Sequence, residues 1–125
     1  MKQRILVVED QEDNRRIMRD LLVNAGYDVI EAADGDEGVK KAKATKPDLI
    51  LMDLQLPVID GLEATRRIKA QPALSETPII AVTSYALGDD NEKARAAGCD
   101  GYFSKPVSPR SLLAKIVSVL PRLKN

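Results

Sequence analysis

Leu49-Ile50-Leu51-Met52-Asp53 is the clearest indication of the fold, because four apolar residues stand directly before an acid. Two similar apolar runs occupy residues 5–8 and 79–82. Runs of this length that are apolar at every position are typical of strands buried on both faces of a parallel sheet. Weaker runs at residues 29–32 and 101–104 suit the two edges of the same sheet.

Apolar residues at helical spacing predict a helix after the first run and another at the end of the chain. The first is expected to stop at Gly26, and its buried residues are expected to be Ile17, Leu21, Leu22 and Ala25. The last begins with Ser108 as its cap and Pro109 in its first turn. Its buried stripe is expected to consist of Leu112, Leu113, Ile116, Val117 and Leu120.

Three further helices are expected between the remaining runs. Asp36 is the expected cap of one that continues to about residue 44, and another contains Leu62, Thr65 and Ile68. The third, at residues 92–97, has a weak polar pattern. A strand followed by a helix, five times over, predicts an α/β fold in which helices cover both faces of a parallel sheet.

Polar residues follow the apolar runs at the point where each strand is expected to end. Glu9 and Asp10 follow the first run, Asp53 the third, Thr83 the fourth, and Lys105 lies just after the fifth. Taken singly, each has an ordinary explanation as a helix cap, a turn residue or a surface charge. Because open parallel sheets bind ligands beyond the carboxyl ends of their strands, the shared placement favours a functional site.

The chemistry of these residues is coherent. Three carboxylates held close together repel one another, and a hard divalent cation relieves that repulsion. Mg²⁺ prefers oxygen ligands and keeps several waters, so few protein ligands suffice. Carboxylates also act as nucleophiles that form aspartyl phosphates, which makes Asp53 a candidate phosphoryl acceptor. Lys105 and the Thr83 hydroxyl are then available for the phosphoryl oxygens.

Composition excludes several other classes. Nineteen basic and nineteen acidic residues balance, so neither a nucleic acid nor an anionic membrane is an expected partner. The chain has no histidine, which excludes histidine-based catalysis and a phosphohistidine of its own. Its single cysteine, Cys99, is expected to be buried and not redox-active. No apolar run approaches the ~20 residues that span a bilayer, so a cytoplasmic protein is expected.

The chain resembles the response-regulator receiver domains of the CheY-like superfamily over essentially its whole length. The matching segments are Ile5-Leu6-Val7-Val8-Glu9-Asp10, Pro47-Asp48-Leu49-Ile50-Leu51-Met52-Asp53-Leu54-Gln55-Leu56-Pro57, Asp60-Gly61, Pro78-Ile79-Ile80-Ala81-Val82-Thr83-Ser84, Ala97-Gly98-Cys99-Asp100-Gly101-Tyr102 and Ser104-Lys105-Pro106. It is most similar to stand-alone receivers and to those of hybrid histidine kinases. The resemblance implies a doubly wound five-stranded sheet in the order 2-1-3-4-5.

By resemblance, Asp53 is the phosphorylation site. Asp10, Asp53 and the backbone carbonyl of Gln55 are the implied Mg²⁺ ligands, and Glu9 acts on the water shell of the metal. Thr83 and Lys105 are implied to contact the phosphoryl group.

The resemblance also implies two conformational features, and one departure from it bears on phosphoryl lifetime. Tyr102 is the aromatic residue whose orientation follows phosphorylation, and the peptide bond between Lys105 and Pro106 is expected to be cis, which costs little before proline. Ser84 stands where many relatives have alanine, so it is a candidate, together with Gln55, for tuning the lifetime of the phosphoryl group.

The implied partner is a histidine kinase or a histidine phosphotransfer protein. Docking is expected on the first helix around Asn14, Arg15 and Met18, and on the loop after Lys105. A downstream protein is expected to contact the fourth helix, fifth strand and fifth helix, around Leu87, Tyr102 and Arg110. The whole chain, residues 1–125, is expected to be a single receiver domain without an output module, and a switch that assists its own phosphorylation and dephosphorylation, not a conventional enzyme.

Three alternatives are weighed against this interpretation. An aspartyl-nucleophile phosphatase needs a second acid two positions after the nucleophile, where this chain has Gln55. An FMN carrier of similar topology needs a phosphate-binding loop after the first strand, and the acidic residues 9–13 repel phosphate. A receiver-fold interaction domain that works without phosphorylation stays open, although the complete set of site residues disfavours it.

Overall fold

The computed structural model describes residues 2–83, 88–105 and 108–120. Its strands are β1 (Arg4–Val8), β2 (Asp28–Ala32), β3 (Leu49–Asp53), β4 (Ile79–Thr83) and β5 (Gly101–Ser104). Its helices are α1 (Glu12–Asn24), α2 (Gly35–Thr45), α3 (Gly61–Lys69), α4 (Gly88–Ala97) and α5 (Pro109–Val119), with the 3-10 turn η1 (Pro72–Leu74) after α3. The alternation of strand and helix predicted from the sequence is confirmed.

The strands form one parallel sheet in the order β2-β1-β3-β4-β5. This is the doubly wound order that the receiver resemblance implies, and it is confirmed. All residues of β3 and β4 are buried. The carboxyl ends of the three inner strands therefore meet at the middle of one edge, which we call the carboxyl edge of the sheet.

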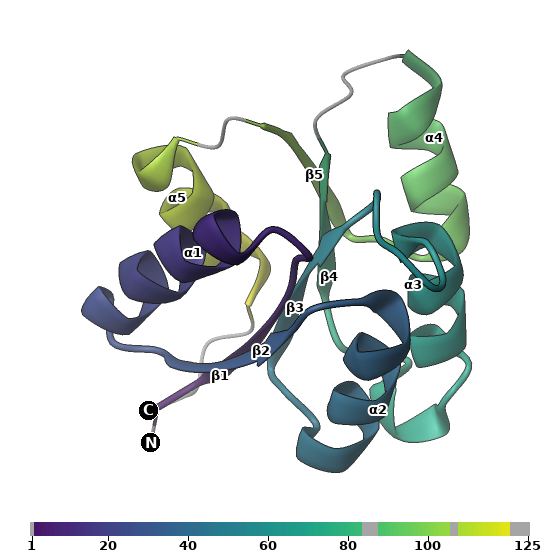
Figure 1. Ribbon diagram of the computed structural model, residues 1–125, viewed down its shortest axis with the longest axis horizontal. Coiled ribbons are helices and arrows are strands. Elements are labelled where there is room, and N and C mark those ends of the chain that lie inside the picture. The colour runs from purple at the N-terminus through teal and green to yellow at the C-terminus, as the bar shows by residue number, and fades with distance from the viewer. Residues whose placement is uncertain (1, 84–87, 106–107, 121–125) are drawn as a thin grey trace.

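Helices cover both faces of the sheet (Figure 1). On one face, Leu22 of α1 and Leu112 and Ile116 of α5 pack against Ile5 and Leu51 of the sheet. The other face packs against α2, α3 and α4, through a cluster that includes Ala42, Ala64, Ile68 and Ala94. The two clusters hold the inner strands rigidly, so that residues at the strand ends are presented from a fixed base.

Side-chain caps begin helices α2, α3 and α5, and one of them differs from the prediction. Asp34, not Asp36, caps α2: the Asp34 side chain accepts a hydrogen bond from the Glu37 amide at 2.7 Å. Asp36 lies instead in the first turn and pairs with Lys40. Ser108 caps α5 with Pro109 in its first turn, as predicted. Helix α4 begins at Gly88, four positions before the expected start, because its polar sequence gives little amphipathic signal.

Three residues assigned to buried stripes face outward. Ile17 is 62% exposed and Val117 is 56% exposed, and Ala25 is exposed where α1 ends. Each lies at the margin of an otherwise correct stripe, where one step around the helix moves a side chain from the core to the surface. The burial predicted for Cys99 is confirmed, and burial raises the pKa of its thiol to about 11.

Candidate functional site

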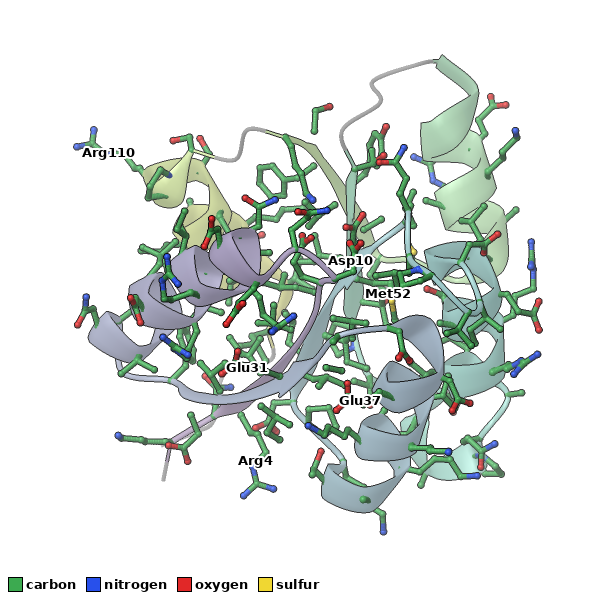
Figure 2. The ribbon with its side chains drawn as sticks, in the orientation of Figure 1. Arg4, Asp10, Glu31, Glu37, Met52 and Arg110 are labelled. Carbon is green, nitrogen blue, oxygen red and sulfur yellow. The ribbon has the colours of Figure 1, made fainter. Side chains whose placement is uncertain are left out.

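Three acids meet at the carboxyl edge of the sheet. Glu9 and Asp10 follow β1, and Asp53 is the last residue of β3. Each of the three offers a carboxylate oxygen that lies within 4.8 Å of the others. Figure 2 shows Asp10 at this edge, above the inner strands. The adjacent pairing of β1 and β3 explains the meeting, because their register sets Val8 beside Met52.

The Glu9 carboxylate is fully buried and has two donors. It accepts hydrogen bonds from the Lys105 ammonium at 2.8 Å and from the Gln11 amide at 3.1 Å. Burial raises the pKa of Glu9, and the nearby Asp53 raises it further, while the two hydrogen bonds oppose the rise. The ionised form of Glu9 is therefore less stable than that of a carboxyl group in water.

The Asp53 carboxylate is 4% exposed and is held by both of its oxygens. Oδ1 accepts a hydrogen bond from the Gln55 amide at 3.0 Å, and Oδ2 accepts one from the Lys105 ammonium at 3.2 Å. A backbone amide two residues further along the chain, that of Gln55, therefore orients the Asp53 carboxylate. Lys105, which is distant in sequence, supplies the positive charge beside it.

Lys105 joins the acids to the neighbouring strands. Burial favours the neutral amine, but the hydrogen bond to Glu9 and the charge of Asp53 outweigh burial and raise the pKa of Lys105. The Lys105 amide donates to the Thr83 carbonyl at 2.7 Å. Thr83 is 1% exposed and lies one step beyond Val82, which is in register with Asp53. The lysine thus touches the ends of β1, β3 and β4.

Gly61 lets the start of α3 approach Asp53. A Cβ at Gly61 would collide with the Asp53 carbonyl and would lie 2.6 Å from the Leu54 Cα, and the Gly61 amide donates to the Leu54 carbonyl at 3.1 Å. Asp60 caps the helix by accepting from the Glu63 amide at 2.8 Å. No side chain fits at position 61, and Asp60 caps the helix, so the structure explains why these two residues stand at the start of α3.

The net charge of the cluster is negative and would be partly neutralised by a bound cation. With all groups ionised, three carboxylates and one ammonium carry a net charge of −2 (−3 + 1) at the centre of the site. The donors are oxygens only, which suits Mg²⁺ better than softer metals. By donor chemistry and spacing, the residues present fit this ion.

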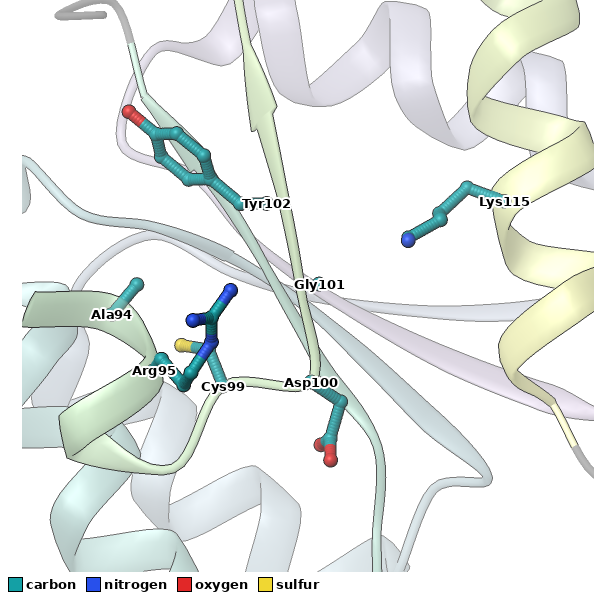
Figure 3. Close-up of a pocket in the computed structure, with 7 residues that line it drawn as sticks. All are labelled: Ala94, Arg95, Cys99, Asp100, Gly101, Tyr102 and Lys115. Atoms are coloured by element: carbon teal, nitrogen blue, oxygen red, sulfur yellow. The ribbon is translucent and has the colours of Figure 1, made fainter. Parts of the chain in front are cut away.

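Two predicted site residues, Ser84 and Pro106, lie outside the described residues, as does Leu87. Tyr102 is half-buried and lines a pocket of about 270 Å³ between α4, β5 and α5 (Figure 3). Arg95 and Lys115 enter this pocket from opposite sides of β5. It is separate from the acid cluster, and its lining belongs to the elements on which the downstream contact is expected.

The docking surface predicted on α1 requires a correction. Met18 is 8% exposed and packs in the core with Leu22, so it is not available to a partner. Arg15 is also engaged internally: its guanidinium donates to the Glu9 carbonyl at 2.8 Å and pairs with Glu31 at 3.2 Å. Sequence reasoning missed this contact, because an arginine on a helix face gives no sign of the carbonyl that it reaches.

Comparison with known proteins agrees with this architecture. The model of the response regulator receiver domain family matches residues 5–117. The chain belongs to the response regulator receiver family. It is 42% identical to the polar-differentiation response regulator DivK of Brucella anthropi, over 96% of this chain and 98% of that protein. Receiver domains act as signalling switches in two-component systems, which is the class predicted from the sequence.

Solved receiver structures are also similar. The chemotaxis protein CheY4 of Vibrio cholerae matches with a TM-score of 0.92 at 32% identity, over 96% of this chain and all of that one. The receiver domain of the sensor histidine kinase PA1611 of Pseudomonas aeruginosa matches with a TM-score of 0.89 at 39% identity, over 95% of this chain and 98% of that one. That structure holds a magnesium ion coordinated in its active site cleft.

None of the helices in the described parts of the receiver chain is long and apolar enough to cross a membrane.

Proposed function

We propose that this receiver accepts a phosphoryl group on Asp53 from the phosphohistidine of a histidine kinase or histidine phosphotransfer protein. The observation that carries the proposal is the position of the Asp53 carboxylate, between two further acids on one side and the Lys105 ammonium at 3.2 Å. A carboxylate so placed has both a nucleophilic oxygen and a fixed positive charge for the incoming group.

In the proposed transfer, an Asp53 carboxylate oxygen attacks phosphorus and forms a P–O bond while the P–N bond to the donor imidazole breaks. The electron pair of the broken bond stays on the imidazole nitrogen. The Gln55 amide holds Oδ1, which leaves Oδ2 beside Lys105 as the oxygen nearest a positive charge. Phosphoryl transfer requires mainly such positioning and charge neutralisation.

Asp10, Asp53 and the Gln55 carbonyl are the proposed Mg²⁺ ligands, with Glu9 acting on the water shell of the ion. When bound, Mg²⁺ supplies positive charge for the phosphoryl oxygens and relieves repulsion among the acids. The oxygen-only cluster of acids supports this assignment, and so does the magnesium ion in the related receiver of the kinase PA1611.

After transfer, Lys105 and Thr83 are the proposed ligands of the phosphoryl oxygens, with Ser84 and Gln55 as neighbours that tune its lifetime. The ammonium of Lys105 leaves Glu9 to follow the new charge, since the phosphoryl group adds nearly two negative charges. The Lys105 amide is bound to the Thr83 carbonyl at 2.7 Å, so movement of one residue affects the ends of both β4 and β5.

The proposed readout surface is formed by α4, β5 and α5, around the pocket that Tyr102, Arg95 and Lys115 line. Reorientation of Tyr102 and a cis peptide bond before Pro106 are parts of the same proposal. A downstream protein, or onward phosphotransfer, then transmits the signal.

The decisive experiment is labelling with acetyl phosphate and Mg²⁺, followed by intact-protein mass spectrometry. Wild-type protein is expected to gain one acid-stable, base-labile phosphoryl group, and Asp53→Asn is expected to gain none. Asp48→Asn is a matched control, because Asp48 is exposed and lies before the same strand. Labelling of Asp53→Asn at the wild-type level would overturn the assignment, and absence of labelling in every variant would favour an interaction domain that works without phosphorylation.

A further inference from the structure

Arg15 connects the metal-binding loop to the edge of the sheet. Its side chain is 18% exposed and leaves the first turns of α1 toward the strand ends. Nη1 donates to the Glu9 carbonyl at 2.8 Å, and Nε pairs with the Glu31 carboxylate at 3.2 Å. One guanidinium thus bridges the backbone after β1 and the side chain of a residue on β2.

Glu31 is itself firmly held. Its second carboxylate oxygen pairs with Arg19 at 3.3 Å, and its backbone carbonyl accepts a hydrogen bond from the Lys41 ammonium at 2.6 Å. Figure 2 shows Glu31 on β2, near the helices that supply these cations. Arg15 is therefore anchored to a fixed point in the sheet, and not to a mobile surface acid.

The backbone that Arg15 holds carries Asp10. The Glu9 amide donates to the Ala32 carbonyl at 3.0 Å, so with Arg15 on the carbonyl both backbone groups of Glu9 are fixed. Because a peptide unit is planar, fixing the Glu9 carbonyl also fixes the amide of Asp10. Among the described residues, the Asp10 carboxylate has no hydrogen bond or ion pair of its own. Its position depends on this peptide.

We propose that Arg15 is a positioning residue for the metal site: by holding the Glu9 carbonyl against Glu31, it fixes Asp10 in place to bind a divalent cation. The inference rests on the proposed function of the acid cluster and deepens it. Mutation of a residue that orients a metal ligand without touching the metal commonly lowers metal affinity by ~10- to 100-fold.

The sign of the effect separates positioning from simple electrostatics. Arg15 carries a positive charge close to the acids, so if charge alone mattered, its removal would strengthen the binding of a cation. Positioning predicts the reverse. Arg16→Ala is the matched control, because it removes the same charge one residue further along the helix. Arg16 is 52% exposed and pairs at 3.1 Å with Asp13, whose side chain is 82% exposed.

The experiment measures Mn²⁺ binding by electron paramagnetic resonance, with Mg²⁺ as competitor, for wild type, Arg15→Ala, Arg15→Lys and Arg16→Ala. We expect roughly 10-fold weaker binding for Arg15→Ala and an unchanged or slightly tighter Kd for Arg16→Ala. Arg15→Lys keeps the charge but cannot donate to two acceptors in a fixed plane, so it is also expected to bind more weakly. Thermal melting without metal reports stability separately.

If wild type binds Mn²⁺ and Arg15→Ala binds it with an equal or tighter Kd, the inference is overturned, while the proposed metal site stands. If wild type itself bound no Mn²⁺, the proposed metal site would fall and the inference with it. Should Arg15→Ala not fold, Arg15→Lys decides: weaker binding supports the positioning role, and wild-type binding overturns it.

Discussion

The substitution Lys105→Met tests how the acid cluster is balanced without metal. Methionine keeps the length and apolar stem of lysine but removes the ammonium that contacts Glu9 at 2.8 Å and Asp53 at 3.2 Å. The side chains of those acids are 0% and 4% exposed, so water cannot replace the lost partner. The variant therefore leaves two neighbouring buried carboxylates with their backbone hydrogen bonds but without the ammonium that balances their charge.

The expected loss follows from these distances. At an effective dielectric constant of about 20, each ion pair attracts with about 5 kcal/mol before the desolvation cost. Removing one partner of a buried pair typically costs about 3–5 kcal/mol. We take the lower end, about 3 kcal/mol, because methionine retains the packing of the stem. For a domain of this size, that loss lowers the melting temperature by roughly 12 °C.

The pH dependence identifies the cause. The hydrogen bond from Lys105 lowers the pKa of Glu9, so in the variant that pKa rises further above its ordinary value. A carboxyl group whose folded-state pKa is raised favours folding while protonated, and this contribution is lost as pH rises through that pKa. The deficit of Lys105→Met is therefore expected to be large at neutral pH and to shrink on acidification. Saturating Mg²⁺ is expected to recover part of it.

Lys69→Met is the control for this measurement. The Lys69 side chain has the same 17% exposure as that of Lys105, and it pairs with Asp100 at 3.1 Å, but the Asp100 side chain is 45% exposed. Melting of both variants is followed by circular dichroism from pH 5 to 8, with and without Mg²⁺. A Lys105→Met deficit that is independent of pH and of Mg²⁺, like that expected for Lys69→Met, would show that packing and not charge balance is lost.

Two further predictions concern residues that touch the same cluster. Glu9→Gln removes a buried charge whose pKa is raised, but it keeps only one acceptor oxygen, so its NH2 group faces one of the two donors, Lys105 or the Gln11 amide. Without metal, its stability relative to wild type is expected to be more favourable at pH 7, where wild type carries the buried charge, than at low pH, where Glu9 is protonated. A chemical-denaturation series across pH checks this, and a difference from wild type that does not change with pH would contradict it. Gly61→Ala forces a Cβ against the backbone of Asp53 and Leu54, so a loss of about 2 kcal/mol and slower labelling of Asp53 are expected. Ala70→Gly, an exposed change at the other end of α3, is expected to leave the labelling rate unchanged.

The architecture could be predicted from the sequence because its signals are local and repeated. The apolar runs at residues 5–8, 49–52 and 79–82 are unbroken, and the polar residues Glu9, Asp53 and Thr83 follow them directly. Parallel pairing then brings the strand ends together whatever the details of the helices. The helix margins were less predictable: Ile17 and Val117 are apolar yet exposed, since a stripe on a helix has no sharp border.

The connections within the site could not be predicted in the same way. That Arg15 reaches the Glu9 carbonyl depends on the angle at which α1 leaves β1, which no pattern of residue types encodes. The clash that excludes a side chain at Gly61 depends likewise on the path of the loop after β3. Such contacts join a side chain to a backbone group, so they leave no matching pair of residue types in the sequence.

The bond between Lys105 and Glu9 joins residues 96 positions apart, and the bond between Lys105 and Asp53 joins residues 52 apart. Closing loops of these lengths costs chain entropy that the two contacts and the packing around them must offset. During synthesis, the first three strands leave the ribosome with their acids before the lysine exists to balance them. The proposed switch therefore gains its balancing positive charge only once the chain has been made as far as Lys105.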